Sequence, residues 1–149
     1  MLKKTHLAIG LAVGFYFLPY VNNKFVFLPV IILASLLPDI DSGFSSVGKN
    51  PVFRPTQWMV KHRGVLHSYT IGILISFIFA FYIPIVALPF FLGYAFHLFA
   101  DSFTVNGIKP FWPLKFVSKG VVRTGGKVEQ SILVVTLIVC FLLGVRLFF

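Results

Sequence analysis

Five apolar stretches alternate with polar connections along the chain. They cover residues 7–21, 25–37, 69–83, 85–100 and 132–149. Most are shorter than the roughly 20 residues that an isolated transmembrane helix needs, and several contain glycine or proline, which membrane helices tolerate when neighbouring helices satisfy the freed backbone groups. The pattern predicts an all-α integral membrane bundle of about five short transmembrane helices, formed by a single domain over residues 1–149.

The connections between these stretches differ in length. Two are long and polar and cover 39–68 and 102–131, whereas 22–24 and the region around Pro84 are tight turns. Short, interrupted spans fit a compact bundle in which some helix ends lie below the lipid headgroups and are surrounded by protein.

The composition excludes several classes of protein. Hydrophobic residues make up 58% of the chain and charged residues 11%, against about a quarter charged in an ordinary soluble domain. This excludes a soluble globular enzyme and a disordered segment. The one cysteine, Cys140, lies in an apolar stretch, which excludes a disulfide scaffold and cysteine-based metal sites. The N-terminus lacks a signal-peptide cleavage site, so we expect an uncleaved first helix.

The charge distribution indicates topology. A net charge of +9 would suggest a nucleic-acid binder in a soluble protein, but the basic residues follow no helix face or RNA-binding motif, and we do not expect nucleic acid as the main partner. Of 13 lysines and arginines, only Lys24 and Arg146 lie on one predicted side of the bundle. The positive-inside rule then places the N-terminus and both long connections in the cytoplasm, in an integral protein of the inner membrane.

Acidic residues and histidines are scarce, and they all fall on that cytoplasmic face. The chain has four of each kind. They are His6, Asp39, Asp41, His62, His67, His97, Asp101 and Glu129. Such groups are costly at membrane depth and usually mark a functional site, so we expect a site at the cytoplasmic ends of the helices.

The spacing within this set suits metal binding. His97 and Asp101 are four residues apart and share a helix face, and Asp39 and Asp41 share a side of an extended segment. Imidazoles combined with carboxylates are ligands suited to Zn²⁺, or to Mn²⁺ or Fe. Two or more such ions, about 3.5–4 Å apart, would activate water for attack on a phosphoester.

His62 and His67 are five residues apart, which is a poor match for one helix face. Gly64 lies between them and permits a loop that turns both side chains inward.

Each residue also has a structural interpretation. His6 alone is more simply a helix-end residue, and His97 with Asp101 would serve as a buried hydrogen-bonded pair. Glu129 is more readily a first-turn acid favoured by the dipole of the last helix than an extra ligand. The structural interpretations would all have to hold independently, which favours a metal site.

Short motifs around these residues resemble those of a known family. They are Thr5-His6, Leu37-Pro38-Asp39-Ile40-Asp41, His62-Arg63-Gly64-Val65-Leu66-His67-Ser68, Gly93-Tyr94 and His97-Leu98-Phe99-Ala100-Asp101-Ser102-Phe103-Thr104. Over about residues 5–130 the chain resembles the YdjM-type family of predicted membrane-bound metal-dependent hydrolases, which is distantly similar to the zinc-dependent phospholipase C and P1 nuclease group. The resemblance implies hydrolysis of a phosphate ester, without naming the substrate. It also implies metal-ligand roles for His6, Asp39, His62, His67, His97 and Asp101.

We therefore expect a membrane-embedded, metal-dependent hydrolase that cleaves a phosphoester of a lipid or membrane-associated substrate. Asp41 is the candidate carboxylate for orienting water or bridging ions, and Arg63 the candidate clamp for the phosphate. Arg123 and Lys127 flank Thr124-Gly125-Gly126, a short loop that would also take an anion. A plain turn is an equally good interpretation of that loop.

The main alternative is a divalent-metal transporter, or a metal-binding membrane module, without hydrolytic activity. Transporters normally place their ligands near the bilayer midplane, whereas these residues gather at one end of the bundle, and the chain is short for transport unless it forms an oligomer. A metal-free histidine phosphatase would need a Pro-Ser-Gly-His-like motif, and the sequence has none. The clustering disfavours a purely structural bundle.

Overall fold

The computed structural model describes residues 1–41 and 65–148, which form helices and irregular connections and contain no strand. The helices are α1 (Lys3–Phe17), α2 (Lys24–Ala34), α4 (Tyr69–Tyr82), α5 (Pro84–Ser102) and α6 (Lys127–Phe148). Short 3₁₀ helices η1 (Leu18–Tyr20), η2 (Leu37–Asp41) and η4 (Val65–His67) accompany them. For the residues that the structure describes, the predicted all-α fold with five helices is confirmed.

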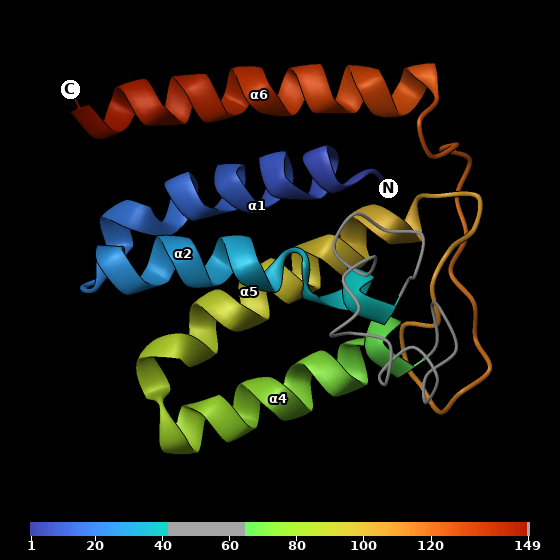
Figure 1. Ribbon diagram of the computed structural model, residues 1–149, viewed down its shortest axis with the longest axis horizontal. Helices are drawn as coiled ribbons and strands as arrows, with labels where there is room; N and C mark the ends of the chain where they lie inside the picture. Colours follow the sequence, from blue (N-terminus) through green and yellow to red (C-terminus); the bar gives the residue numbers. More distant parts are fainter. Residues whose placement is uncertain (42–64, 149) are drawn as a thin grey trace.

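The helices run back and forth along one direction, so that several ends meet on the same side of the bundle (Figure 1). Helix α5 contacts α1, α2 and α4, whereas α6 packs mainly on α1. The starts of α1 and α4 and the ends of α2 and α5 therefore lie together, beside the N-terminus in Figure 1. The predicted polar site depends on this convergence.

Local sequence signals set the helix boundaries. Ser68 caps α4, because its hydroxyl oxygen accepts a hydrogen bond from the backbone N–H of Ile71 at 3.4 Å. Pro84 occupies the first turn of α5, where its missing N–H is not needed, and so divides two apolar stretches into two helices. Helix α1 ends at Phe17, before the predicted boundary at residue 21, because the next turn is the 3₁₀ helix around Pro19.

Two of the helices are long and apolar enough to cross a membrane, by length and composition. They are α5 and Lys127–Leu147 of α6. Helices α1, α2 and α4 have 15, 11 and 14 residues, which is below the roughly 20 residues of a full span. The arrangement of five transmembrane spans stays a prediction. Helix α6 leaves most of its apolar surface, including Phe141 and Leu142, exposed.

The core of the bundle depends on a close approach of α5 to α2. Ala34, Phe90, Tyr94, Leu98 and Ile108 form a buried apolar cluster between these helices and the long connection after α5. At the same level, a Cβ atom on Gly93 would lie 2.3 Å from the backbone oxygen of Ile31. A glycine at this position therefore lets the two backbones touch.

We expect Gly93→Ala to lower the free energy of unfolding by about 1–3 kcal/mol, because the added methyl group overpacks the α2–α5 contact. Gly144→Ala is a matched control on α6, where the added Cβ would meet only the Phe15 ring at 3.7 Å. Denaturant titration of the detergent-purified variants measures the difference, and equal stability of the two would contradict the packing argument.

Candidate metal centre

Five of the predicted ligands meet at one end of the bundle and form what we call the His/Asp cluster. They are His6 of α1, Asp39 of η2, His67 of η4, and His97 and Asp101 of α5. Four of them are at most 1% exposed, and the Asp39 side chain is 13% exposed. The cluster thus collects imidazoles and carboxylates from four separate segments in a place nearly closed to bulk water.

The possible ligand atoms are spaced as a shared ion requires. Nε2 of His67 lies 4.0 Å from Oδ1 of Asp39 and 3.8 Å from Oδ2 of Asp101. Nε2 of His97 lies 3.9 Å and 4.0 Å from the same two oxygens. Tetrahedral ligands at the usual zinc distances are separated by about 3.3–3.5 Å, so a contraction of a few tenths of an ångström would bring these atoms onto one ion.

His97 is held in the orientation that a metal ligand needs. Its Nδ1 lies 2.7 Å from the backbone oxygen of Ser35, which can only accept, so Nδ1 donates the proton. The lone pair on Nε2 then faces the cluster, and this atom has no hydrogen-bond partner within residues 1–41 and 65–148. A second partner that fixes the tautomer in this way is typical of metal-binding histidines.

Asp101 has its two carboxylate oxygens on different sides of the cluster. Oδ1 contacts the amino group of Met1 and lies 3.3 Å from Nε2 of His6, whereas Oδ2 faces His67 and His97. The His6 ring stacks on that of His97, with centroids 3.8 Å apart and an interplanar angle of 14°. This is the arrangement of a carboxylate that can bridge two positions.

Among the residues that the structure describes, two combinations of three satisfy the spacing for a single ion. They are His6, Asp39 and His97, and His67, His97 and Asp101. Because His97 belongs to both sets, the combinations overlap in one compact region, and the cluster could bind a metal ion.

Burial raises the pKa of the Asp39 carboxyl above its ordinary value, and the nearby imidazoles of His6 and His67 act in the opposite direction. Asp39 also has the most exposed side chain of the cluster residues. Asp39 therefore keeps its proton to a higher pH than an exposed aspartate does.

The backbone around His67 is anchored by two hydrogen bonds to side chains. The Tyr94 hydroxyl donates to the backbone oxygen of Leu66, and the Ser68 hydroxyl donates to that of Val65 at 2.7 Å. Sequence reasoning included Tyr94 only within a motif and did not single out Ser35 at all. A backbone acceptor such as the Ser35 oxygen leaves no signature in residue type.

Glu129 joins the first helix to the last instead of pointing into the cluster. Its Oε1 accepts hydrogen bonds from the backbone N–H of Leu2 at 2.5 Å and from the Thr5 hydroxyl at 2.8 Å. Its Oε2 accepts from the N–H of Gly125 at 2.6 Å. The N-cap residue of α1 makes no side-chain cap of its own, so Glu129 supplies that cap from another helix and fixes the turn that carries His6.

The remaining predicted site residues lie away from the cluster or outside the described residues. Arg123 and Lys127 are exposed on the connection before α6 and at its first residue. Asp41 is the last residue of η2, and its side chain is outside the described structure. His62 and Arg63 belong to residues 42–64, which also lie outside it.

We expect Glu129→Ala to lower the free energy of unfolding by about 1.5–3 kcal/mol, because it removes a charged acceptor from three donors. Gln130→Ala, at the exposed neighbouring position, should change it by less than about 0.5 kcal/mol. Denaturant titration in EDTA tests the cause: the loss should persist without metal, whereas equal stability of Glu129→Ala and wild type in EDTA would identify Glu129 as a ligand.

Comparison with known proteins confirms the resemblance inferred from the motifs. The whole chain, residues 1–149, matches the family model described as YdjM inner membrane protein. The chain is 31% identical to the Bacillus subtilis protein YvsG over an alignment of 157 positions, gaps included, which covers 95% of this chain and 93% of YvsG. No solved structure matches significantly.

Two curated relatives carry the family name. The chain is 34% identical over 98 residues to inner membrane protein YdjM of Escherichia coli, and equally so to that of Shigella flexneri. The aligned region covers 60% of this chain but only 50% of those relatives. The match to the family model and the similarity to YvsG both cover nearly all of the chain, so this chain belongs to the YdjM inner membrane protein family.

Proposed function

We propose that the chain is a membrane-embedded, metal-dependent hydrolase that cleaves a phosphoester of a lipid or membrane-associated substrate. The observation that carries the proposal is the His/Asp cluster itself: three imidazoles and two carboxylates from four segments, nearly closed to water in an otherwise apolar bundle. Groups of this kind are costly to bury without a compensating ion or partner. Zn²⁺ suits the donor set best, with Mn²⁺ and Fe as alternatives.

The geometry of Asp101 supports a second ion, because its two oxygens face different groups. His97 is common to both sets of three ligands, so its Nε2 would bind only one of the ions. Divalent ions bound here would supply Lewis acidity, lowering the pKa of water toward 7 and neutralising charge on phosphoryl oxygens.

The protein residues then have distinct tasks. His97 presents Nε2 in a fixed tautomer through its bond to Ser35. Asp39, at the partly exposed edge of the cluster, is placed to orient water or to take up its proton. We retain Asp41 as the candidate carboxylate that assists this step and Arg63 as the phosphate clamp, with Arg123 and Lys127 as weaker candidates for substrate binding.

The proposed membrane orientation rests on the distribution of basic residues. Met1, whose amino group contacts Asp101, lies at the end of the bundle marked N in Figure 1, and the excess of lysine and arginine favours the cytoplasm for that end. The substrate phosphoester would then be reached from the cytoplasmic leaflet of the inner membrane.

A divalent-metal-binding or transporting module is the second candidate. The near-complete burial of four of the five cluster residues favours it, because an ion fits such a space more easily than a phosphoester does. The position of the cluster at one end of the helices argues against it, since transport sites lie near the midplane.

We expect the purified protein to contain stoichiometric divalent metal by mass spectrometry and to hydrolyse at least one member of a panel of lipid and soluble phosphate mono- and diesters. EDTA should abolish turnover, and added Zn²⁺ or Mn²⁺ should restore it. Metal exchange across proteoliposomes without turnover of any ester would support the transporter instead.

Substitution within the cluster separates metal binding from general damage. His97→Ala should remove metal and reduce kcat/KM by more than the roughly 10–100-fold typical of lost outer-shell contacts. Cys140→Ala is the control, because it alters a buried thiol on α6, which bonds to the Ala8 oxygen and lies outside the cluster. Full metal content in a folded His97→Ala protein would refute the proposed ligand set.

A further inference from the structure

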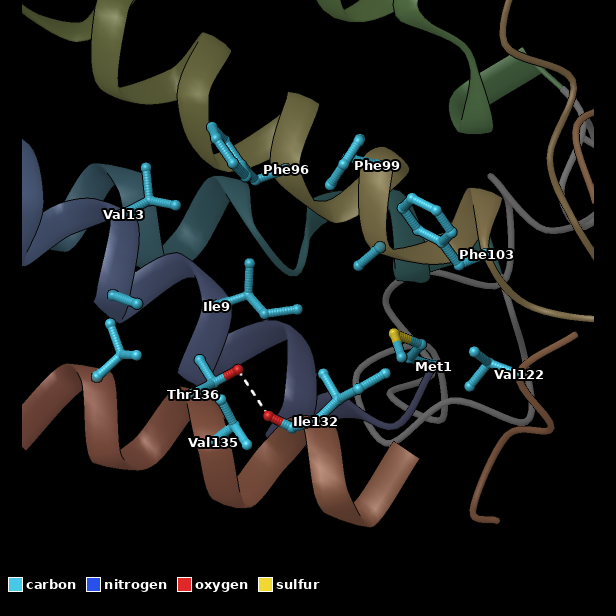
Figure 2. A pocket seen from close by; sticks show the side chains of 13 residues that line it. Met1, Ile9, Val13, Phe96, Phe99, Phe103, Val122, Ile132, Val135 and Thr136 are labelled. Atoms are coloured by element: carbon cyan, nitrogen blue, oxygen red, sulfur yellow. Dashed lines mark hydrogen bonds between the residues drawn. The ribbon is translucent and has the colours of Figure 1, made fainter. Parts of the chain in front are cut away.

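An apolar groove of about 470 Å³ lies between α1, α5 and α6. Figure 2 shows its walls, which include Ile9 and Val13 of α1, Phe96 and Phe99 of α5, and Ile132 and Val135 of α6. The Thr136 hydroxyl, the one polar side-chain group among the lining residues, donates to the backbone oxygen of Ile132 at 2.7 Å. The volume is that of an ordinary ligand site.

One end of the groove adjoins the His/Asp cluster. Met1 and Ala100 both line the groove, the amino group of Met1 contacts Asp101, and Ala100 immediately precedes Asp101 in α5. Ile9 lies one helical turn after His6 and faces the same side of α1. A ligand that fills the groove would therefore bring its end next to the candidate metal ligands.

The groove also opens sideways. Helices α5 and α6 each pack against α1, so α1 forms the floor between them, and the lining residues Phe99 and Val135 are 53% and 59% exposed. Among the described helices, α5 and α6 are the two that are long and apolar enough to cross a membrane. In an inner membrane protein this opening is continuous with the apolar surface of α6 that faces lipid.

The chemistry of the lining selects the occupant. A peptide, sugar or nucleotide would bury polar groups against a wall that offers them no partner, whereas a hydrocarbon chain loses nothing there. We propose that the groove holds one acyl chain of a bilayer lipid, with the lipid's phosphoester at the cluster. This inference rests on the proposed function and narrows the substrate class to lipids with a long acyl chain.

The test uses wild-type protein in vesicles of phosphatidylcholine and phosphatidic acid that carry a small fraction of lipid with a photoactivatable diazirine in the acyl chain. Any lipid-facing residue of α6 will be labelled, so the readout is labelling of Ile9 and Val13 on the groove floor, mapped by peptide mass spectrometry. We expect strong labelling of both residues, and its absence would overturn the proposal.

Matched substitutions on α6 establish that the groove is the route. Val135→Trp and Val139→Trp add bulk at lining positions and should reduce labelling of the floor to background. Val134→Trp adds the same bulk at a neighbouring position that is similarly exposed but does not line the groove. In this variant the groove floor should be labelled as strongly as in wild type. Equal labelling in all variants, or crosslinks from the groove to a second copy of the chain instead of to lipid, would overturn the proposal.

The two proposals fail in different ways. Labelling of the floor in the folded His97→Ala protein, which lacks the proposed metal, should equal that of wild type, so the acyl-chain site stands even if no hydrolysis is found. If the protein hydrolyses esters, Val135→Trp should retain its metal and its turnover of water-soluble esters but lose its preference for long-chain lipid. Undiminished long-chain preference in that variant would overturn the acyl-chain site while leaving the hydrolase intact.

Discussion

The hydrogen bond from His97 to the backbone oxygen of Ser35 joins the packing of the bundle to its chemistry. It exists because α5 approaches α2 closely at Gly93, where any side chain would meet the Ile31 backbone oxygen. The same bond decides which nitrogen of His97 carries the proton and turns the other nitrogen toward the carboxylates. A change in the packing of α5 against α2 near Gly93 would therefore alter the orientation of His97 in the cluster.

Two buried acids place the first helix in different ways. Asp101 contacts the amino group of Met1 and lies close to His6, and Glu129 accepts hydrogen bonds from Leu2 and Thr5. The first turn of α1 is thus held from α5 on one side and from α6 on the other, which restricts the position of the His6 ring. Of these two acids, only Asp101 belongs to the cluster. Its oxygens lie beside imidazoles, whereas those of Glu129 accept hydrogen bonds from backbone N–H groups and the Thr5 hydroxyl.

Much of this architecture could be predicted from the sequence, and the failures have physical causes. Alternating apolar and polar segments predicted five helices. Histidines and acids at the ends of these helices, with His97 and Asp101 one turn apart, predicted the residues of the candidate metal site. The hydrogen bonds from His97 to the Ser35 oxygen and from Tyr94 to the Leu66 oxygen were not predictable, because they use backbone oxygens brought near by tertiary packing. The number of spans stays a prediction, since apolarity is visible in sequence, whereas among the described helices α5 and α6 alone have the length and composition to cross a membrane. The likeness to zinc-dependent phospholipases stays a prediction.

The position of the groove relative to the cluster determines from which sides an acyl chain and water would approach the candidate metal ligands. The groove reaches the cluster on the side of Met1 and Asp101, whereas Asp39, whose side chain is partly exposed, lies in η2 and does not line the groove. An acyl chain and the water needed for hydrolysis would therefore approach from different sides. The cluster histidines and acids lie together at one end of the bundle, where an apolar approach from lipid and a polar approach from water would meet at the same atoms.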